Sequence, residues 1–175
     1  MIENPKTSPM REPSRLEDLL SFQLHHLQGV GGAPVIRLLE GQYGITRREW
    51  RLLAHLRQSG KLSPSDLAYE VRLDRARTSR AISDLLTKGL IERIKMPNDP
   101  RRALVMLTAK GLSLVEEIFP QIADIHRHWV SVLSEQDLGQ LEKFLALLTQ
   151  QAHHINTSFS THLKADRKLG KRAPN

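Results

Sequence analysis

The sequence predicts a mainly α-helical fold that carries one small β-hairpin, and two observations lead to this prediction. Several stretches place apolar residues three and four positions apart, which is the spacing of one helix face, and residues that favour helix N-termini open these stretches. Near the middle, the runs LIERIKM and RALVMLT have strand character instead, and the turn-forming letters PNDPR separate them. We therefore expect a helical body with a single hairpin.

The N-terminal part is expected to contain an arm and two helical pieces. Residues 1–14 hold three prolines and mixed polar side chains, which favours a flexible arm. A helical stripe of leucines follows over residues 15–28. The letters GVGGAP then predict a break, because glycine and proline are unfavourable inside a helix. A second helical piece is expected to end at Gly44.

Three helices are predicted in the middle of the chain. Thr46, with Glu49 three residues later, forms a capping-box pattern, and the helix that it opens stops at Gly60. A short helix begins at Pro64, because proline suits the first helical position. Asp74 caps the third helix, which ends at the glycine of the letters TKGL. The hairpin follows directly.

Two long helices are predicted after the hairpin. The first begins at Thr108 and contains Pro120, which is expected to kink it. Ser134 with Asp137 opens the second, whose leucines and phenylalanine form an apolar stripe. Residues 158–175 are polar and basic without periodicity, so we expect a disordered basic tail.

The charge of the chain is concentrated in two segments. The formal net charge is +7; residues 72–102 hold nine lysines and arginines against four carboxylates, and residues 164–175 hold five against one. This concentration of charge indicates a polyanionic partner, although a basic face that is simply in contact with water would explain the charge equally well.

No apolar run reaches the length of about 20 residues that spans a bilayer, and cysteine is absent. We therefore expect a cytoplasmic protein without a membrane anchor or disulfide bonds. If the polyanionic partner is DNA, the protein is associated with the nucleoid when it is bound.

Two short helices, a third helix with a basic outer face and a hairpin follow one another, which is the order of a winged helix-turn-helix. A helix of this kind fits the major groove of DNA, and arginine can bind a guanine or a phosphate through two parallel hydrogen bonds. The cationic hairpin tip is suited to grip phosphates or to enter the minor groove. On helical spacing and charge, five residues are candidates for contact with DNA: Arg75, Arg77, Ser83, Asn98 and Arg102.

Two segments, GITRREWRLLAHL and LSPSDLAYEVRLDRARTSRAISDLLTKGLIERIKMPNDPRRALVMLTAKG, resemble the core of the MarR family of bacterial transcription regulators. The resemblance extends over roughly Leu16–His154, and the D-x-R pair of the wing, Asp99 and Arg101, belongs to its most specific part. By this resemblance, Arg101 contacts DNA, and Asp99 holds it in position by a charged hydrogen bond. The resemblance also implies that three residues of the third helix, the one that Asp74 caps, contact DNA: Thr78, Ser79 and Arg80.

The resemblance also implies an assembly and a mechanism. Residues 15–157 would form one domain, in which the winged helix-turn-helix of residues 46–108 joins a dimerisation lobe made by residues 15–45 and 109–157. Such a homodimer binds a pseudo-palindromic operator on double-stranded DNA. It is expected to be a repressor that a small effector, aromatic or anionic, releases by binding between the lobes. The GVGGAP break and Pro100 depart from the family pattern.

Two residues are candidates for effector binding. His25 is suited to an anionic effector because a protonated imidazole is a cation, and Trp50 is suited to stack on an aromatic ring. For both residues the alternative is a structural role, which in the case of Trp50 means a place in the core.

Two other functions compete with the regulator hypothesis. A non-specific or architectural nucleic-acid-binding protein would use the same fold without effector control. An enzyme is disfavoured, because no Ser/His/Asp set stands out and GVGGAP lacks the Lys-Ser/Thr pair of a phosphate-binding loop. Adjacent histidines such as His25 and His26 point to different helix faces rather than to one metal. We therefore expect neither a metal nor another cofactor.

Overall fold

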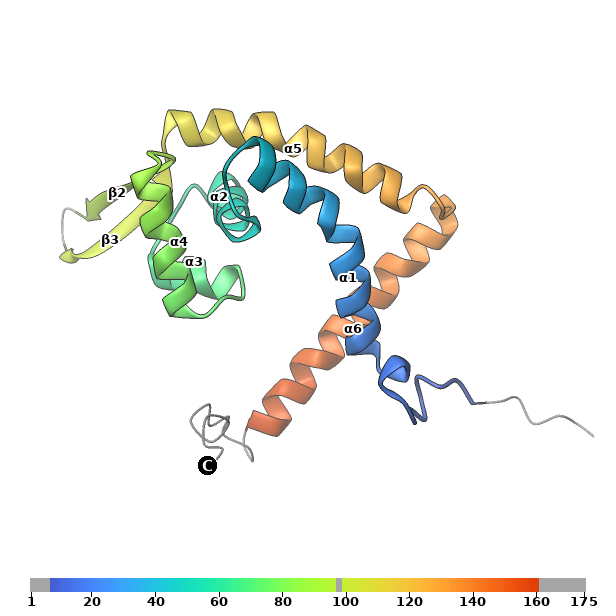
Figure 1. The fold of residues 1–175 in the computed structure, drawn as a ribbon. Helices are drawn as coiled ribbons and strands as arrows, with labels where there is room; N and C mark the ends of the chain where they lie inside the picture. The colour runs from blue at the N-terminus through green and yellow to red at the C-terminus, as the bar shows by residue number, and fades with distance from the viewer. Residues whose placement is uncertain (1–6, 97–98, 161–175) are drawn as a thin grey trace, which may run out of the picture. The chain divides into compact units, whose positions relative to one another are not determined.

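The computed structural model describes residues 7–96 and 99–160, which are mainly helical with a small antiparallel sheet, as the sequence predicts (Figure 1). The chain divides after Trp129 into two compact units, which are described separately. The first unit contains the helical segments η1 (Leu16–Asp18), α1 (Leu20–Ile36), the π-helical η2 (Arg37–Gln42), α2 (Arg47–Ser59), α3 (Pro64–Glu70), α4 (Arg75–Thr87) and nearly all of α5 (Ala109–Val130). It also contains the strands β1 (Lys61–Leu62), β2 (Ile91–Met96) and β3 (Asp99–Leu107). The second unit contains α6 (Glu135–Ser160).

Helix α1 runs without interruption through the letters GVGGAP, so the predicted break is wrong. A side chain at Gly31 would collide with the Trp129 ring of α5, and a Cβ at Gly32 would lie 3.0 Å from Nη1 of Arg47 in α2. The glycines therefore let α1 pack closely against both helices. A glycine costs a helix about 1 kcal/mol relative to alanine, but a larger residue at Gly31 would displace the Trp129 ring.

The helical region widens after Pro34, which lies inside α1 and has no N–H to donate. The amide of Arg37 donates to the carbonyls of Ala33 and Pro34, and the chain continues as the π-helical η2. Gly44, with a φ of 62°, follows this region, and the second helical piece therefore ends where the sequence predicts.

The helices of the central part begin and end as predicted. Oγ1 of Thr46 accepts a hydrogen bond from the Glu49 amide (3.2 Å), and the Glu49 carboxylate accepts one from the Thr46 amide (2.7 Å), which completes the capping box of α2. Gly60, with a φ of 75°, ends α2. Asp74 caps α4 by accepting a hydrogen bond from the amide of Arg77.

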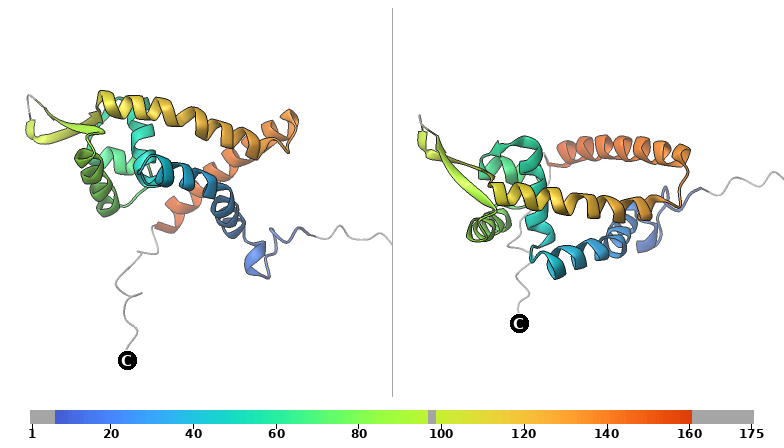
Figure 2. Two further views of the ribbon diagram at one scale, coloured as in Figure 1. Left: turned by 45° about the horizontal axis from the view of Figure 1, so that its top comes forward. Right: turned by 90° about the horizontal axis from the view of Figure 1, so that it is seen from above.

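The predicted hairpin consists of β2 and β3, and β1 extends it to a sheet with the strand order β1-β3-β2, antiparallel throughout. Ile91 of β2 lies opposite Leu107, and Lys61 of β1 lies opposite Met106. A strand of two residues has too short a pattern to be recognised in a sequence, so β1 was not predicted. Figure 2 shows the hairpin beside α4 at the N-terminal end of α5.

Both predicted C-terminal helices are present. Helix α5 continues through Pro120 as one helix. In the second unit, the Ser134 hydroxyl donates to the Asp137 carboxylate (2.6 Å) and accepts from the Asp137 amide, which caps α6. Because α6 extends to Ser160, the first residues of the expected tail are helical. Residues 161–175, like residues 1–6 of the expected arm, lie outside the described residues. None of the described helices combines the length and the apolar character that crossing a bilayer requires.

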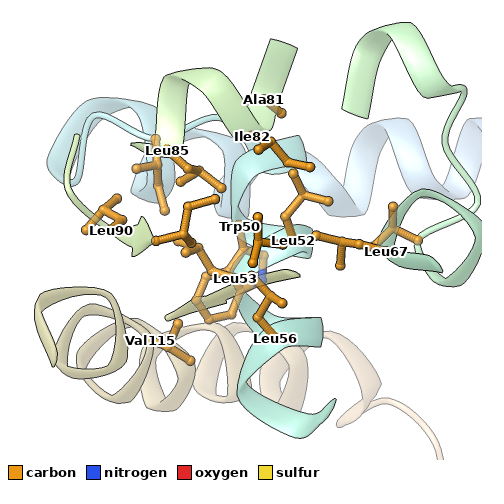
Figure 3. Packing of buried hydrophobic residues seen from close by; sticks show 14 of the residues in the cluster. Trp50, Leu52, Leu53, Leu56, Leu67, Ala81, Ile82, Leu85, Leu90 and Val115 are labelled. Carbon is orange, nitrogen blue, oxygen red and sulfur yellow. The ribbon is translucent and has the colours of Figure 1, made fainter. Parts of the chain in front are cut away.

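The core of the first unit lies between α2, α4 and the start of α5 (Figure 3). Helix α2 contributes Trp50, whose side chain is 8% exposed, and three buried leucines. Burying one such side chain stabilises a fold by about 1.5–3 kcal/mol, so the cluster holds the helices in fixed relation. Further members come from α3, α4 and α5: Leu67, Ile82, Leu85, Val115 and Ile118.

Gly111 allows α5 to approach the backbone at Leu90, the residue immediately before β2. A Cβ there would overlap the carbonyl oxygen of Leu90, which accepts a hydrogen bond from the Thr108 amide and has no freedom to yield. We expect Gly111→Ala to lower the free energy of unfolding by about 1–3 kcal/mol. In α1, nothing lies within 4 Å of a Cβ at Gly29, so Gly29→Ala should leave stability unchanged or raise it by up to about 1 kcal/mol. Urea unfolding of both variants measures the difference, and equal stabilities would contradict the close approach.

Candidate nucleic-acid interface

Helix α4 presents one face to the core and a basic face to solvent. Ala81, Ile82 and Leu85 are buried. The exposed face is the one that helical spacing predicts. It carries five of the residues that the sequence assigns to contact with DNA: Arg75, Arg77, Ser79, Arg80 and Ser83.

The first turn of α4 is held by Asp74. The Asp74 carboxylate accepts a hydrogen bond from the Arg77 amide at 2.9 Å and forms an ion pair with Nε of Arg77 at 3.1 Å. Arg77 therefore lies against the start of its own helix. Among the side chains that the structure describes, no ion pair involves Arg75 or Arg80. Because the positive end of the helix dipole adds to their charge, this end of α4 is suited to an anionic partner.

Thr78 differs from the expectation that the family resemblance gave. Its side chain is 1% exposed, and its hydroxyl donates a hydrogen bond to the Asp74 carbonyl at 3.0 Å. A buried hydroxyl that is engaged within the helix cannot reach a base edge or a phosphate. Thr78 therefore belongs to the core face of α4 and not to the candidate interface.

The C-terminal end of α4 is joined to the start of α2 by an ion pair between Lys88, which is partly exposed, and the buried carboxylate of Glu49. Nζ of Lys88 lies 2.6 Å from Oε1 of Glu49, and it also donates to the Gly44 carbonyl at 2.9 Å. Burial of Glu49 opposes its ionisation, but hydrogen bonds from Lys88 and Thr46 outweigh burial and lower the pKa of the carboxyl below its usual value. The ion pair therefore fixes the C-terminal end of α4, while the buried residues of α4 hold the helix to the core.

Sequence reasoning missed the pairing of Glu49 with Lys88. The capping-box pattern identifies Glu49, but its partner stands 39 residues later in the chain. A lysine in the last turn of a helix is also expected from the helix dipole alone. No local signal therefore distinguishes Lys88 as the residue that positions α4.

The wing is formed by β2 and β3, and Arg101 and Arg102 lie on β3. The ladder places Asp99 opposite Met96, with a register shift next to Lys95. Asn98 lies outside the described residues. The contact expected between Asp99 and Arg101 stays a prediction, since it involves side chains outside the described part.

The two effector candidates occupy different surroundings. Trp50 is buried in the core and has the structural role that was its alternative, whereas His25 is exposed on α1. Neither residue lines the hollow of about 350 Å³ between α2 and α5, whose walls include Ala54, Val115 and Phe119.

The segment that forms the candidate interface also matches a known family. A family model described as MarR family matches residues 43–102, which contain α2, α3, α4 and the start of the hairpin. The chain is 30% identical over 121 residues to the HTH-type transcriptional regulator FarR of Neisseria gonorrhoeae, covering 69% of this chain and 83% of that protein. It is 31% identical over 102 residues to the multiple antibiotic resistance protein MarR of Salmonella typhimurium, covering 58% and 71%.

Solved structures of related proteins share the fold. A MarR mutant from E. coli, complexed with operator DNA, has a TM-score of 0.64 at 26% identity and covers 77% of this chain and 99% of that chain. The S. aureus MepR–DNA complex has a TM-score of 0.69 at 26% identity, with coverages of 76% and 98%. The winged-helix arrangement is therefore common to these proteins and to this chain.

Glu49→Gln removes the charge of the buried carboxylate and keeps the shape of the side chain. At pH 7 we expect it to lower the free energy of unfolding by about 1–3 kcal/mol, because Lys88 loses a charged acceptor. Since folding lowers the pKa of Glu49, the stabilisation is fully present above the usual value of 4.5 and is lost as the pH falls through the lowered pKa.

Thermal unfolding at several pH values tests this expectation. The difference between wild type and Glu49→Gln should shrink below pH 4.5. Glu116→Gln is the control, because Glu116 forms an exposed ion pair with Arg57, and such pairs contribute about 0–1 kcal/mol. A destabilisation by Glu49→Gln that does not change with pH would contradict the role of the ion pair.

Proposed function

The chain belongs to the MarR family, and from this premise we propose that it is a transcription regulator that binds double-stranded DNA at specific sequences. We further propose that it acts as a homodimer on a pseudo-palindromic operator and represses until a small effector releases it. The observation that carries the proposal is the exposed row of Arg75, Ser79, Arg80 and Ser83 on one face of α4. This row begins at the positive end of the helix.

The chemistry of this row suits the reading of DNA. The major groove of B-DNA is about 12 Å wide and admits one helix. Arg80 can donate two parallel hydrogen bonds to a guanine, and Arg75, in the first turn, is suited to a phosphate. The Ser83 hydroxyl donates to the Ser79 carbonyl at 3.1 Å, so its lone pairs stay free to accept from a base amino group.

The proposed homodimer would cover apolar side chains that are exposed in each unit. On α6, Leu141, Phe144, Leu145 and Leu148 follow helical spacing and are 40–49% exposed. An apolar stripe of this kind favours contact with another apolar surface, and a second copy of the chain supplies one. A two-fold symmetric dimer in turn matches an operator whose half-sites lie about 34 Å apart. Exposed apolar residues of α1 would extend the interface: Leu24, Leu27 and Val30.

The hollow between α2 and α5 is the proposed effector site. Its volume of about 350 Å³ suits a small ring compound. Val115 and Phe119 provide apolar walls, and Arg57, 3.6 Å from the Glu116 carboxylate, provides a cation at its edge. This combination favours an aromatic, anionic effector. Its binding would shift α2 against α5 and weaken operator binding by a coupling free energy of typically about 1–3 kcal/mol.

Selection of bound fragments from a random-sequence DNA pool tests the proposed specificity. We expect a two-fold symmetric site to be enriched. Arg80→Ala should lower the affinity for that site by about 1–3 kcal/mol and change the affinity for random DNA little, because it removes a base contact. Arg127→Ala, which removes an exposed arginine of α5 paired with Asp124, should keep the enrichment. Binding without enrichment would instead indicate a non-specific nucleic-acid-binding protein.

Phe144→Asp tests the proposed dimer. If the α6 stripe is buried between two copies, the new carboxylate must lose its hydration. We therefore expect the dimer dissociation constant to rise about tenfold or more, equivalent to about 1.4 kcal/mol or more. Gln150→Asp, on the opposite face of α6, should leave the dissociation constant unchanged. Sedimentation equilibrium measures both, and a wild-type monomer would contradict the dimer.

A further inference from the structure

A hollow of about 430 Å³ lies in the first unit where the C-terminal region of α1, the first turns of α2 and the start of α4 meet, and arginines dominate its lining. Arg47, Arg48 and Arg51 come from α2, and Arg77 comes from α4. Glu40 of η2 is the carboxylate in this lining. The three α2 arginines are therefore separate from the proposed base contacts, which lie on α4.

Three of the four guanidinium groups are positioned by the protein itself. Nη2 of Arg51 donates to the Val71 carbonyl at 2.6 Å, which fixes it at the turn between α3 and α4. Arg77 is held by Asp74 at 3.1 Å. Arg47 packs against α1 at Gly32, where a side chain would meet its Nη1.

Arg48 has a different environment. It is exposed, and among the described side chains it takes part in no ion pair. It stands three residues before Arg51 on the same helix face, where two like charges destabilise a helix. Bracing of the α3–α4 turn accounts for Arg51, but it does not account for Arg48. An additional cation beside three positioned cations indicates that this hollow receives an anion.

We infer that the hollow binds a phosphate group of the DNA backbone, at the edge of the groove that α4 enters. The inference rests on the proposed function and extends the interface from α4 to α2. Guanidinium groups bind phosphate oxygens through paired, charge-assisted hydrogen bonds. Arg77 lies on the flank of α4 next to α2, so a phosphate in the hollow would adjoin the helix that reads the bases. Contacts of this kind set the register of a protein on DNA and carry no sequence information.

The salt dependence of DNA binding tests the inference. Arg48→Gln should weaken binding to the enriched site and to random duplex alike. It should also make the slope of log K against log salt concentration shallower by about two, because a dimer loses one phosphate contact in each protomer. Arg48→Lys keeps the charge and should keep the wild-type slope. Arg127→Gln is the matched control, since Arg127 is an exposed arginine of α5, paired with Asp124 and outside this hollow. Thermal unfolding checks that the variants are folded.

The outcomes separate this inference from the proposed function. If Arg48→Gln keeps the slope of Arg127→Gln while Arg80→Ala loses the enriched site, the hollow does not contact DNA and the inference is overturned, whereas the regulator stands. If Arg48→Gln flattens the slope on random duplex and no site is enriched, the phosphate contact stands and sequence-specific regulation fails. Stabilisation of the wild type by inorganic phosphate that is lost in Arg48→Gln, with an unchanged DNA slope, would identify a small-anion site and overturn the inference.

Discussion

The buried carboxylate of Glu49 is the group on which the orientation of α4 depends. One of its oxygens completes the capping box with Thr46, and the other binds Lys88, so a single side chain fixes the start of α2 and the end of α4. Lys88 also donates to the Gly44 carbonyl, and the Lys88 carbonyl accepts a hydrogen bond from Lys110 of α5. Four segments of the first unit therefore meet around one ion pair, and this pair and the buried residues of α4 together fix the direction of the helix.

The opposite end of α4 violates the usual preference for acidic residues in a first helical turn. Arg75 and Arg77 stand there, and the Asp74 cap compensates the charge of Arg77 through an ion pair. The helix tolerates this charge because Ile82 and Leu85 are buried and because its far end is anchored by Lys88. An unfavourable charge at a helix end that the core nevertheless stabilises is typical of a functional site. The negative charge of DNA phosphates would neutralise these arginines.

Features determined by near neighbours could be predicted from the sequence, and features determined by distant contacts could not. The capping residues of α2 and α4 bind backbone amides three positions away, so the sequence predicts where these helices begin. The run GVGGAP was mistaken for a break, because the partner that justifies Gly31 is Trp129, far along the chain. The buried side chain of Thr78 was missed for another reason. Its position four residues before Ile82 and seven before Leu85 places it on the apolar face of α4, but the family resemblance assigned it to DNA.

Helix α5 is held at two distant points by glycines, and this gives the proposed effector a route to the DNA-binding helix. At its start, Gly111 allows backbone contact with Leu90, which follows α4, and near its end Trp129 packs on Gly31 of α1. Close-packed contacts of this kind do not deform gradually. In the proposed mechanism, a ligand between α2 and α5 would shift α5 and, through these two contacts, move α4 relative to α1. In the proposed dimer, joined through α1 and α6, such a movement would change the spacing between the two copies of α4. An operator with half-sites at a fixed spacing would then bind less tightly.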